Sequence, residues 1–153
     1  MSVPDRKALL ELCRQALEAR KREYAGELLS LDEAAAAETK SSAGDKYETG
    51  REMIAQSRNL ISHNLSETVA HLETLDRMAA APLRDRIGFG SLAETSLGWY
   101  LVGVSLGEVE IGGVLVRTVS LASPLGTTLR GKSPGDSLPW RGSSLEILRI
   151  PTG

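Results

Sequence analysis

The sequence lacks several features that identify common classes of protein. Its 153 residues include one cysteine, Cys13, which excludes an intramolecular disulfide and fits a reducing compartment. No apolar run approaches the ~20 residues that span a bilayer, and the N-terminal residues lack the hydrophobic core of a signal peptide. We therefore expect a soluble, cytoplasmic protein with no membrane partner.

A surplus of basic residues is also missing, and aromatic residues are scarce. Lys and Arg total 18 against 20 Asp and Glu, which gives a formal net charge of -2. A chain with this balance lacks the strongly basic surface expected of a DNA-binding protein. Aromatic residues make up 4% of the chain, and its first half is rich in Ala, Leu, Glu and Arg, which favours long helices.

The first half carries two long helical patterns separated by a break at 41–44. The first pattern starts near Pro4 and repeats every seven residues, as in a seam that packs against a second helix. Its seam residues are Leu10, Leu17, Tyr24 and Leu31. The second pattern runs over 51–80 without glycine or proline. Its apolar residues follow helical spacing at Met53, Ile54, Ile61, Leu65, Val69, Leu72 and Leu75. We predict an antiparallel hairpin over 1–80 that protrudes, because ~35-residue helices are about 50 Å long.

The composition changes after Pro82, where glycines separate short runs rich in Val, Ile, Leu, Trp and Tyr. Such runs predict the strands of a small antiparallel sheet. The expected strands are 87–93, 98–106, 114–120, 136–140 and 144–150. Gly112 and Gly113 predict a hairpin turn, and Ser123 before Pro124 predicts the start of a short helix over 124–129. The fold class is therefore α+β, with an antiparallel β domain over 81–153.

Some reactive or aromatic residues have a simple structural interpretation. Cys13 lies near the predicted seam and is interpreted as a small core residue. The aromatic residues of the second half are interpreted as core or half-buried strand residues rather than as a stacking platform for bases. They are Trp99, Tyr100 and Trp140.

Asp45 and Glu48 stand three residues apart where the second helical pattern begins. One interpretation is a capping box, with Asp45 as the N-cap and Glu48 as the N3 residue of the helix. The other is that two carboxylates at an exposed turn supply hard oxygen ligands for Mg²⁺. The two interpretations are compatible, because a carboxylate has more than one lone pair.

The segment Gly-Asp-Lys-Tyr-Glu at 44–48 is similar to the G-D-x-x-E motif at the hairpin tip of the Gre family of bacterial transcript-cleavage factors. A second segment, 123–136, resembles the S-P-[IL]-G-x-x-L-x-G-K-x-x-G-D pattern of the same family. With the change from helices to sheet near Pro82, the resemblance covers nearly the whole chain.

The resemblance implies that 81–153 is an FKBP-like domain that docks on RNA polymerase, while the hairpin enters the secondary channel of that enzyme. Asp45 and Glu48 would be the catalytic and metal-binding residues, because they would help hold a second Mg²⁺ jointly with the polymerase. The polymerase would then hydrolyse the 3′ end of backtracked RNA by two-metal catalysis. The factor would be a monomer and no enzyme itself. The residues implied in polymerase binding are Ser123, Pro124, Leu125, Gly126, Gly131, Lys132, Gly135 and Asp136.

The chain departs from the family directly after Glu48. The family continues its tip as E-N-x-E-Y, whereas Thr49-Gly50-Arg51-Glu52 follows here. Arg51 brings a cation that can pair with an acid or contact an RNA phosphate. A regulator that occupies the channel without efficient cleavage therefore stays open as an alternative. An alternative of another class is a peptidyl-prolyl isomerase or chaperone domain, against which the scarcity of aromatic residues counts.

Overall fold

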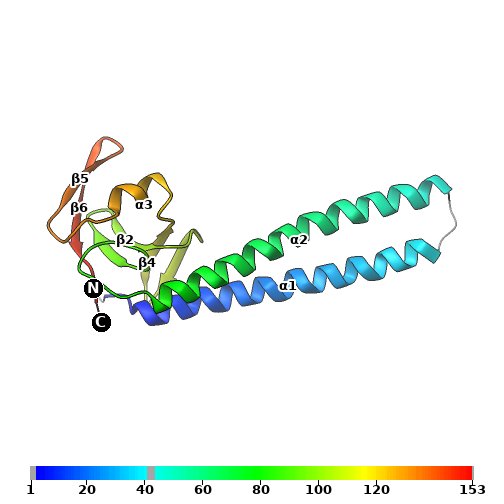
Figure 1. Ribbon diagram of the computed structural model, residues 1–153, viewed down its shortest axis with the longest axis horizontal. Coiled ribbons are helices and arrows are strands. Elements are labelled where there is room, and N and C mark those ends of the chain that lie inside the picture. The colour runs from blue at the N-terminus through cyan, green and yellow to red at the C-terminus, as the bar shows by residue number, and fades with distance from the viewer. Residues whose placement is uncertain (1–2, 41–43, 153) are drawn as a thin grey trace. The chain divides into compact units, whose positions relative to one another are not determined.

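The computed structural model describes residues 3–40 and 44–152, without the side chains of residues 38–40 and 44–48. Two long N-terminal helices precede a C-terminal six-stranded sheet, so the chain is α+β as expected (Figure 1). The chain divides into two compact units. One unit combines Met1–Arg14 with Glu73–Gly153, and the other is Gln15–Leu72. Each unit is described separately below.

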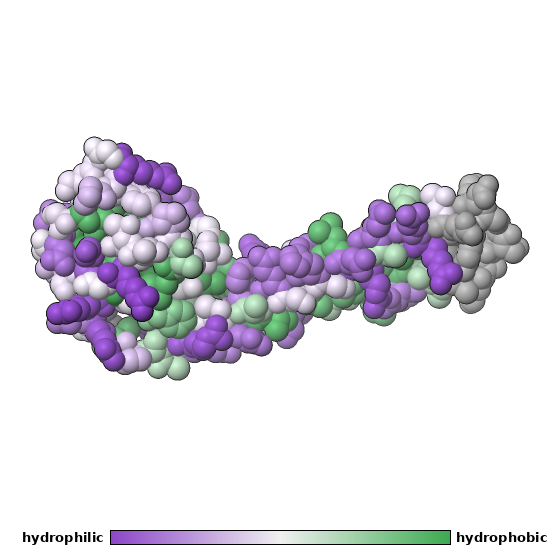
Figure 2. Space-filling view, turned by 45° about the horizontal axis from the view of Figure 1, so that its top comes forward, coloured by the Kyte–Doolittle hydropathy of each residue, from purple (hydrophilic) through white to green (hydrophobic). Residues whose placement is uncertain are grey.

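The unit Gln15–Leu72 contains most of helices α1 (Arg6–Lys40) and α2 (Gly44–Ala80). The two helices lie side by side in Figure 1, and Arg58 of α2 forms an ion pair with Asp32 of α1. Leu17 is 1% exposed and confirms the predicted seam at that position. Of the apolar residues that follow helical spacing in α2, Leu72 is 7% exposed and packs inside, whereas Met53 is 63% exposed. Figure 2 shows the helical pair as mainly hydrophilic with separate hydrophobic areas, and single exposed apolar side chains of this kind are normal on a soluble surface.

The other unit is built on one sheet with strand order β3-β4-β2-β1-β6-β5. The strands and the helix that follows β4 have these bounds: β1 Leu92–Thr95, β2 Gly98–Val102, β3 Glu108–Ile111, β4 Val114–Val119, α3 Pro124–Leu129, β5 Ser137–Trp140 and β6 Ser143–Arg149. The bounds of α3 match the sequence prediction. The predicted hairpin turn is also confirmed, because Gly112 and Gly113 have φ angles of 56° and 79° between β3 and β4.

The sheet is mixed, and the prediction of an antiparallel sheet was wrong. Strand β3 was not predicted, and its pairing with β4 places β4 between β3 and β2, where β4 runs parallel to β2. The predicted strand over 98–106 is shorter than expected and ends at Val102. Strand β1 starts at Leu92 rather than 87, because Ser91 bonds back to Gly88 through both its amide and its hydroxyl and forms a turn there.

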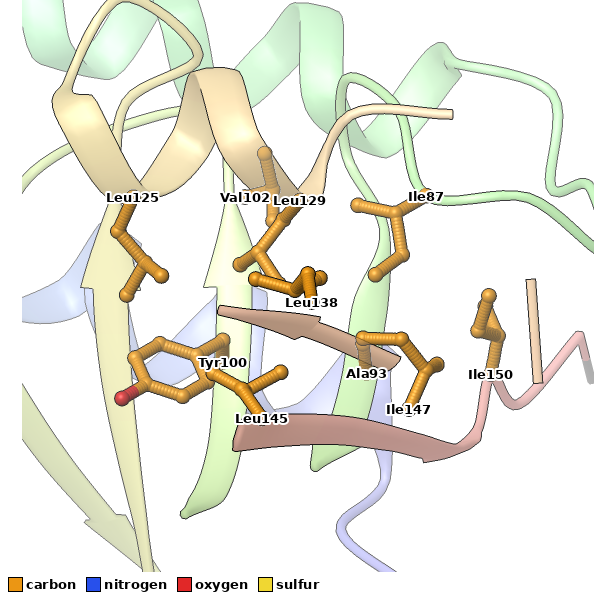
Figure 3. Packing of buried hydrophobic residues seen from close by; sticks show 10 residues of the cluster. All are labelled: Ile87, Ala93, Tyr100, Val102, Leu125, Leu129, Leu138, Leu145, Ile147 and Ile150. Atoms are coloured by element: carbon orange, nitrogen blue, oxygen red, sulfur yellow. The ribbon is translucent and has the colours of Figure 1, made fainter. Parts of the chain in front are cut away.

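One core lies between the sheet and α3. Figure 3 shows side chains from α3 and from strands β1, β2, β5 and β6 converging there. The cluster comprises Ile87, Ala93, Tyr100, Val102, Leu125, Leu129, Leu138, Leu145, Ile147 and Ile150. The ring of Tyr100 packs in this cluster, while its hydroxyl points away from the other labelled side chains. Trp99, at 5% exposed, and half-buried Trp140 confirm the prediction that the aromatic residues are core or half-buried strand residues.

Arg6 joins the first turn of α1 to the last turn of α2 and to the loop before β1. Its Nη2 donates to the carbonyl oxygen of Met78 at 2.5 Å, and its Nε donates to that of Gly90 at 2.7 Å. Carbonyls in the last turn of a helix have no partner inside the helix, so the guanidinium satisfies one of them. Burial lowers the pKa of Arg6, but an arginine remains protonated. Next to this joint, a Cβ at Gly103 would lie 2.7 Å from the sulfur of Met78.

We expect the substitution Arg6→Met to lower the free energy of unfolding by about 2 kcal/mol, because the carbonyls of Met78 and Gly90 lose a charged donor. Methionine keeps the apolar stem, so the loss reports the hydrogen bonds rather than packing. Lys7→Met is the matched control at an exposed neighbouring position, with an expected change within about 0.5 kcal/mol. Urea unfolding of both variants measures the difference, and equal stabilities would contradict the role of Arg6.

Candidate functional site

The connection between α1 and α2 carries the first candidate site. Helix α2 begins at Gly44, one residue before the predicted N-cap Asp45. The segment before it lies outside the described residues, as do the side chains of Asp45 and Glu48, so both interpretations of these acids stay predictions. The described backbone is nevertheless helical through Asp45 and Glu48. Because helical residues three apart lie on one face, the two acids share a face at the connected end of α2.

The second candidate site starts at the N-terminus of α3. Ser123 is the N-cap of α3: its Oγ accepts from the amide of Gly126 at 3.0 Å and donates to the carbonyl of Ser120 at 2.7 Å. Pro124 occupies the first helical turn, where its missing N–H costs nothing. Gly126 is buried, and a Cβ there would overlap the carbonyl oxygen of Ser120. Glycine at 126 is therefore required by the backbone of this fold.

The rest of the segment also has structural roles. Gly131 follows α3 with a φ of 81°, the left-handed conformation that commonly ends a helix, and its amide donates to the carbonyl of Ile87. Pro134 and Gly135, with φ 92°, form the centre of a turn of type II character. Asp136 closes this turn, because its Oδ2 accepts from the amide of Ser133 at 2.8 Å. The motif therefore specifies local backbone geometry throughout its length.

Because several of the residues predicted to bind polymerase have structural roles, fewer of their side chains are free to contact a partner. Leu125 is 8% exposed and belongs to the core. Pro124 is exposed and Lys132 half-buried, and the hydrogen bonds described above do not use their side chains. Ser123, Pro124 and Leu125 also line a shallow groove, whereas the members of the set from 126 onward do not.

This groove has a volume of about 650 Å³ and was not predicted from the sequence. It lies where α3, the C-terminal part of β4 and the hairpin of β5 and β6 meet. Its lining comprises Leu97, Tyr100, Gly107, Glu108, Arg117, Thr118, Val119, Ser123, Pro124, Leu125, Trp140, Arg141 and Ser143. The lining is mainly apolar and contains two aromatic side chains, which is typical of a binding site for another molecule. Its residues come from separate segments of the chain, so no linear motif marks it.

Arg117 fixes one wall of the groove. Its guanidinium bonds to Tyr100, to Glu108 at 3.3 Å and to the carbonyl of Leu97 at 3.4 Å. The hydrogen bond with Tyr100, followed by the interaction with Glu108, raises the pKa of Arg117. The charge of Arg117 is thus balanced by Glu108 inside the groove, and its geometry is set by three acceptors.

Other reactive groups do not form a site in the described part of the chain. Cys13 is 2% exposed, and burial raises the pKa of its thiol, which confirms a packing role and disfavours the reactive thiolate. Among residues 3–40 and 44–152 with described side chains, no three His, Cys, Asp or Glu residues gather as metal ligands would. Within the same residues, none of the helices has the length and apolar character needed to cross a bilayer.

Comparison with known proteins gives no further assignment: no family model matches the chain, and no curated protein matches it.

The glycine requirement at 126 generates a direct test. We expect Gly126→Ala to lower the free energy of unfolding by at least about 2 kcal/mol, because α3 must move away from Ser120. Gly88→Ala is the matched control, since a Cβ at 88 meets no atom within 4 Å and its φ is not positive. Thermal unfolding of the full chain should separate the two variants. Similar melting temperatures would show that the motif glycine is dispensable for the fold.

Proposed function

We propose that this chain is a Gre-like factor that binds bacterial RNA polymerase in the cytoplasm and stimulates cleavage of backtracked RNA. The observation that carries the proposal is the pair of long helices whose connection leads into the Gly-Asp-x-x-Glu segment. Asp45 and Glu48 share one helical face there, a spacing that allows both to reach a common ion. The segment 123–136 supports the same assignment through its length and spacing.

The chemistry of the two acids fits Mg²⁺. This ion prefers oxygen ligands and is held in enzymes by one or two carboxylates together with phosphates and water, so Asp45 and Glu48 would supply part of the coordination and the polymerase the rest. When bound, the ion would favour an attacking hydroxide and stabilise charge on the scissile phosphate. The role of this chain is then to bring two carboxylates to the RNA 3′ end and to hold them on one rigid helix.

We further propose that the sheet and α3 form an FKBP-like domain that docks on the polymerase through the groove. Three of the residues to which the resemblance gives a polymerase-binding role, Ser123, Pro124 and Leu125, line this groove. Leu97 lies on the rim of the groove and is 43% exposed. Its apolar side chain is therefore available to pack against a partner. Burial of apolar surface is the dominant favourable term in most protein–protein association.

The residues after Glu48 leave a related function open. Arg51 is exposed and three positions from Glu48 on a continuous helix, so a cation neighbours the acids. A nearby cation weakens the attraction of the site for Mg²⁺. A factor of this kind would occupy the polymerase channel and regulate it without efficient cleavage.

A function of another class is favoured by the aromatic lining of the groove. Tyr100 and Trp140 are both on it, although aromatic residues are few in the chain. A prolyl-isomerase domain binds its peptide in an apolar, aromatic groove. An isomerase assay with the full chain and a proline peptide separates this function from polymerase binding: catalysed isomerisation supports it, and an uncatalysed rate excludes it.

We expect Asp45→Asn and Glu48→Gln each to abolish stimulated RNA cleavage while polymerase binding stays nearly unchanged. An amide has the size of the carboxylate but is a poor Mg²⁺ ligand, whereas Asn and Gln still suit helix capping. Cleavage by stalled elongation complexes is measured with each variant, and higher Mg²⁺ should restore part of the activity. The matched control is Glu23→Gln, an exposed acid of α1 far along the sequence.

Three outcomes of this assay differ in meaning. Full activity of both variants would reduce Asp45 and Glu48 to capping residues. An inactive parent protein that binds polymerase would favour the channel-occupying regulator. A parent protein that neither binds nor stimulates would contradict the whole proposal.

The groove makes a separate prediction about docking. We expect Leu97→Asp to weaken polymerase binding by about tenfold or more, since it places an unpaired charge in an apolar contact. Leu148→Asp is the matched control, because Leu148 is 46% exposed but does not line the groove. Competition binding with the full chain measures both affinities. Equal losses, or none, would place the docking surface elsewhere.

A further inference from the structure

The tip of the hairpin between β5 and β6 holds an arginine in a backbone conformation that arginine rarely adopts. Trp140 pairs with Ser143, so Arg141 and Gly142 form the two-residue turn. Their φ angles are 48° and 79°, and Arg141 is the only non-glycine residue with positive φ among the described residues. Such a turn requires positive φ at both central positions and favours Asn, Asp or Gly. Arginine there costs free energy, and strain of this kind gathers at functional positions.

The side chain of Arg141 is directed to the groove. Its guanidinium carbon lies 5.2 Å from the centroid of the Trp140 ring, and both residues are part of the groove lining. Glu108 is the one acid among the lining residues described, and it bonds to Arg117. The charge of Arg141 is therefore not balanced within the groove. The groove combines an apolar floor with one uncompensated cation at its rim.

We propose that Arg141 is the charge-selecting residue of the groove. It binds a carboxylate on the docking segment of RNA polymerase, while a neighbouring apolar side chain of that segment fills the groove beside Trp140 and Leu97. This inference rests on the proposed function and adds the chemistry of the partner. A guanidinium recognises a carboxylate through paired hydrogen bonds, and stacking on Trp140 holds its plane in place. A nucleic acid fits less well, because its phosphate backbone is bound by several cations rather than by one beside an apolar floor.

The test compares three variants of the full chain for binding to bacterial RNA polymerase core enzyme. Arg141→Asn removes the charge and suits the turn, so affinity should fall about tenfold while the melting temperature does not fall. Arg141→Lys keeps both the charge and the backbone cost but loses the paired hydrogen bonds and the planar stacking, so its affinity should fall less than that of Arg141→Asn. Arg149→Gln is the matched control, because Arg149 also lies over a tryptophan, Trp99 at 5.4 Å, but does not line the groove. Its affinity should change less than twofold.

Several results would overturn the inference. Unchanged affinity of Arg141→Asn would do so, as would equal losses in the Asn and Lys variants, which would mean that charge is irrelevant. An equal loss in Arg149→Gln would show that the effect is not specific to the groove. A loss of binding to a single-stranded RNA oligonucleotide, with polymerase affinity unchanged, would assign Arg141 to nucleic acid instead. Failure of the parent protein to bind polymerase would contradict the proposed function itself. If the parent protein binds but the variants depart from the expected pattern, only the role of Arg141 is contradicted.

Discussion

The structure depends on the joint at which the helix ends meet the sheet. Arg6 sits in the first turn of α1, where a positive charge opposes the helix dipole, yet its guanidinium bridges the carbonyls of Met78 and Gly90. The same cation is favourable at the C-terminus of α2, because the dipole is negative there. Gly103 leaves room for the side chain of Met78 beside this bridge. Two helix ends and the strand region thus share one set of hydrogen bonds, within one compact unit.

The motif over 123–136 shows how a sequence signature can specify local backbone structure. Ser123 caps α3, Gly126 allows α3 to approach Ser120, and Asp136 closes the turn after it. Substitution of these residues would disturb the backbone whether or not they touch a partner. Loss of binding in such variants would therefore say little about an interface. Exposed residues of the groove, such as Leu97, test docking without this ambiguity.

The parts of the fold that could be predicted are those with a local cause. Helix α3 follows from a serine cap before a proline, and the turn before β4 follows from two adjacent glycines. Strand β3 was missed because it has four residues, two of them glutamate, and its strand conformation depends on pairing with β4. The parallel pairing of β2 and β4 is non-local in the same way.

The two candidate sites also differ in whether their residues are close together in the sequence. Asp45 and Glu48 form a contiguous motif, so the sequence identifies them, and their interpretation as Mg²⁺ ligands stays a prediction. The groove is assembled from separate segments, so no contiguous motif marks Leu97 or Arg117. The one local signal was the Arg-Gly pair at 141–142, where a two-residue turn would ordinarily carry Asn or Gly at its first position. An unfavourable residue in a turn is therefore the kind of sequence signal that could have marked this edge of the groove, although it was not used to predict the groove.

The central claim is that the connected end of α1 and α2 reaches the polymerase active centre. A cysteine introduced as Lys46→Cys, in a Cys13→Ala background, can carry an iron chelate that generates hydroxyl radicals close to its attachment point. The account predicts that the labelled protein, bound to a stalled elongation complex, cuts the RNA near its 3′ end. The same chelate on Leu148→Cys should not do so. Binding to polymerase without cutting near the RNA 3′ end from position 46 would contradict the account.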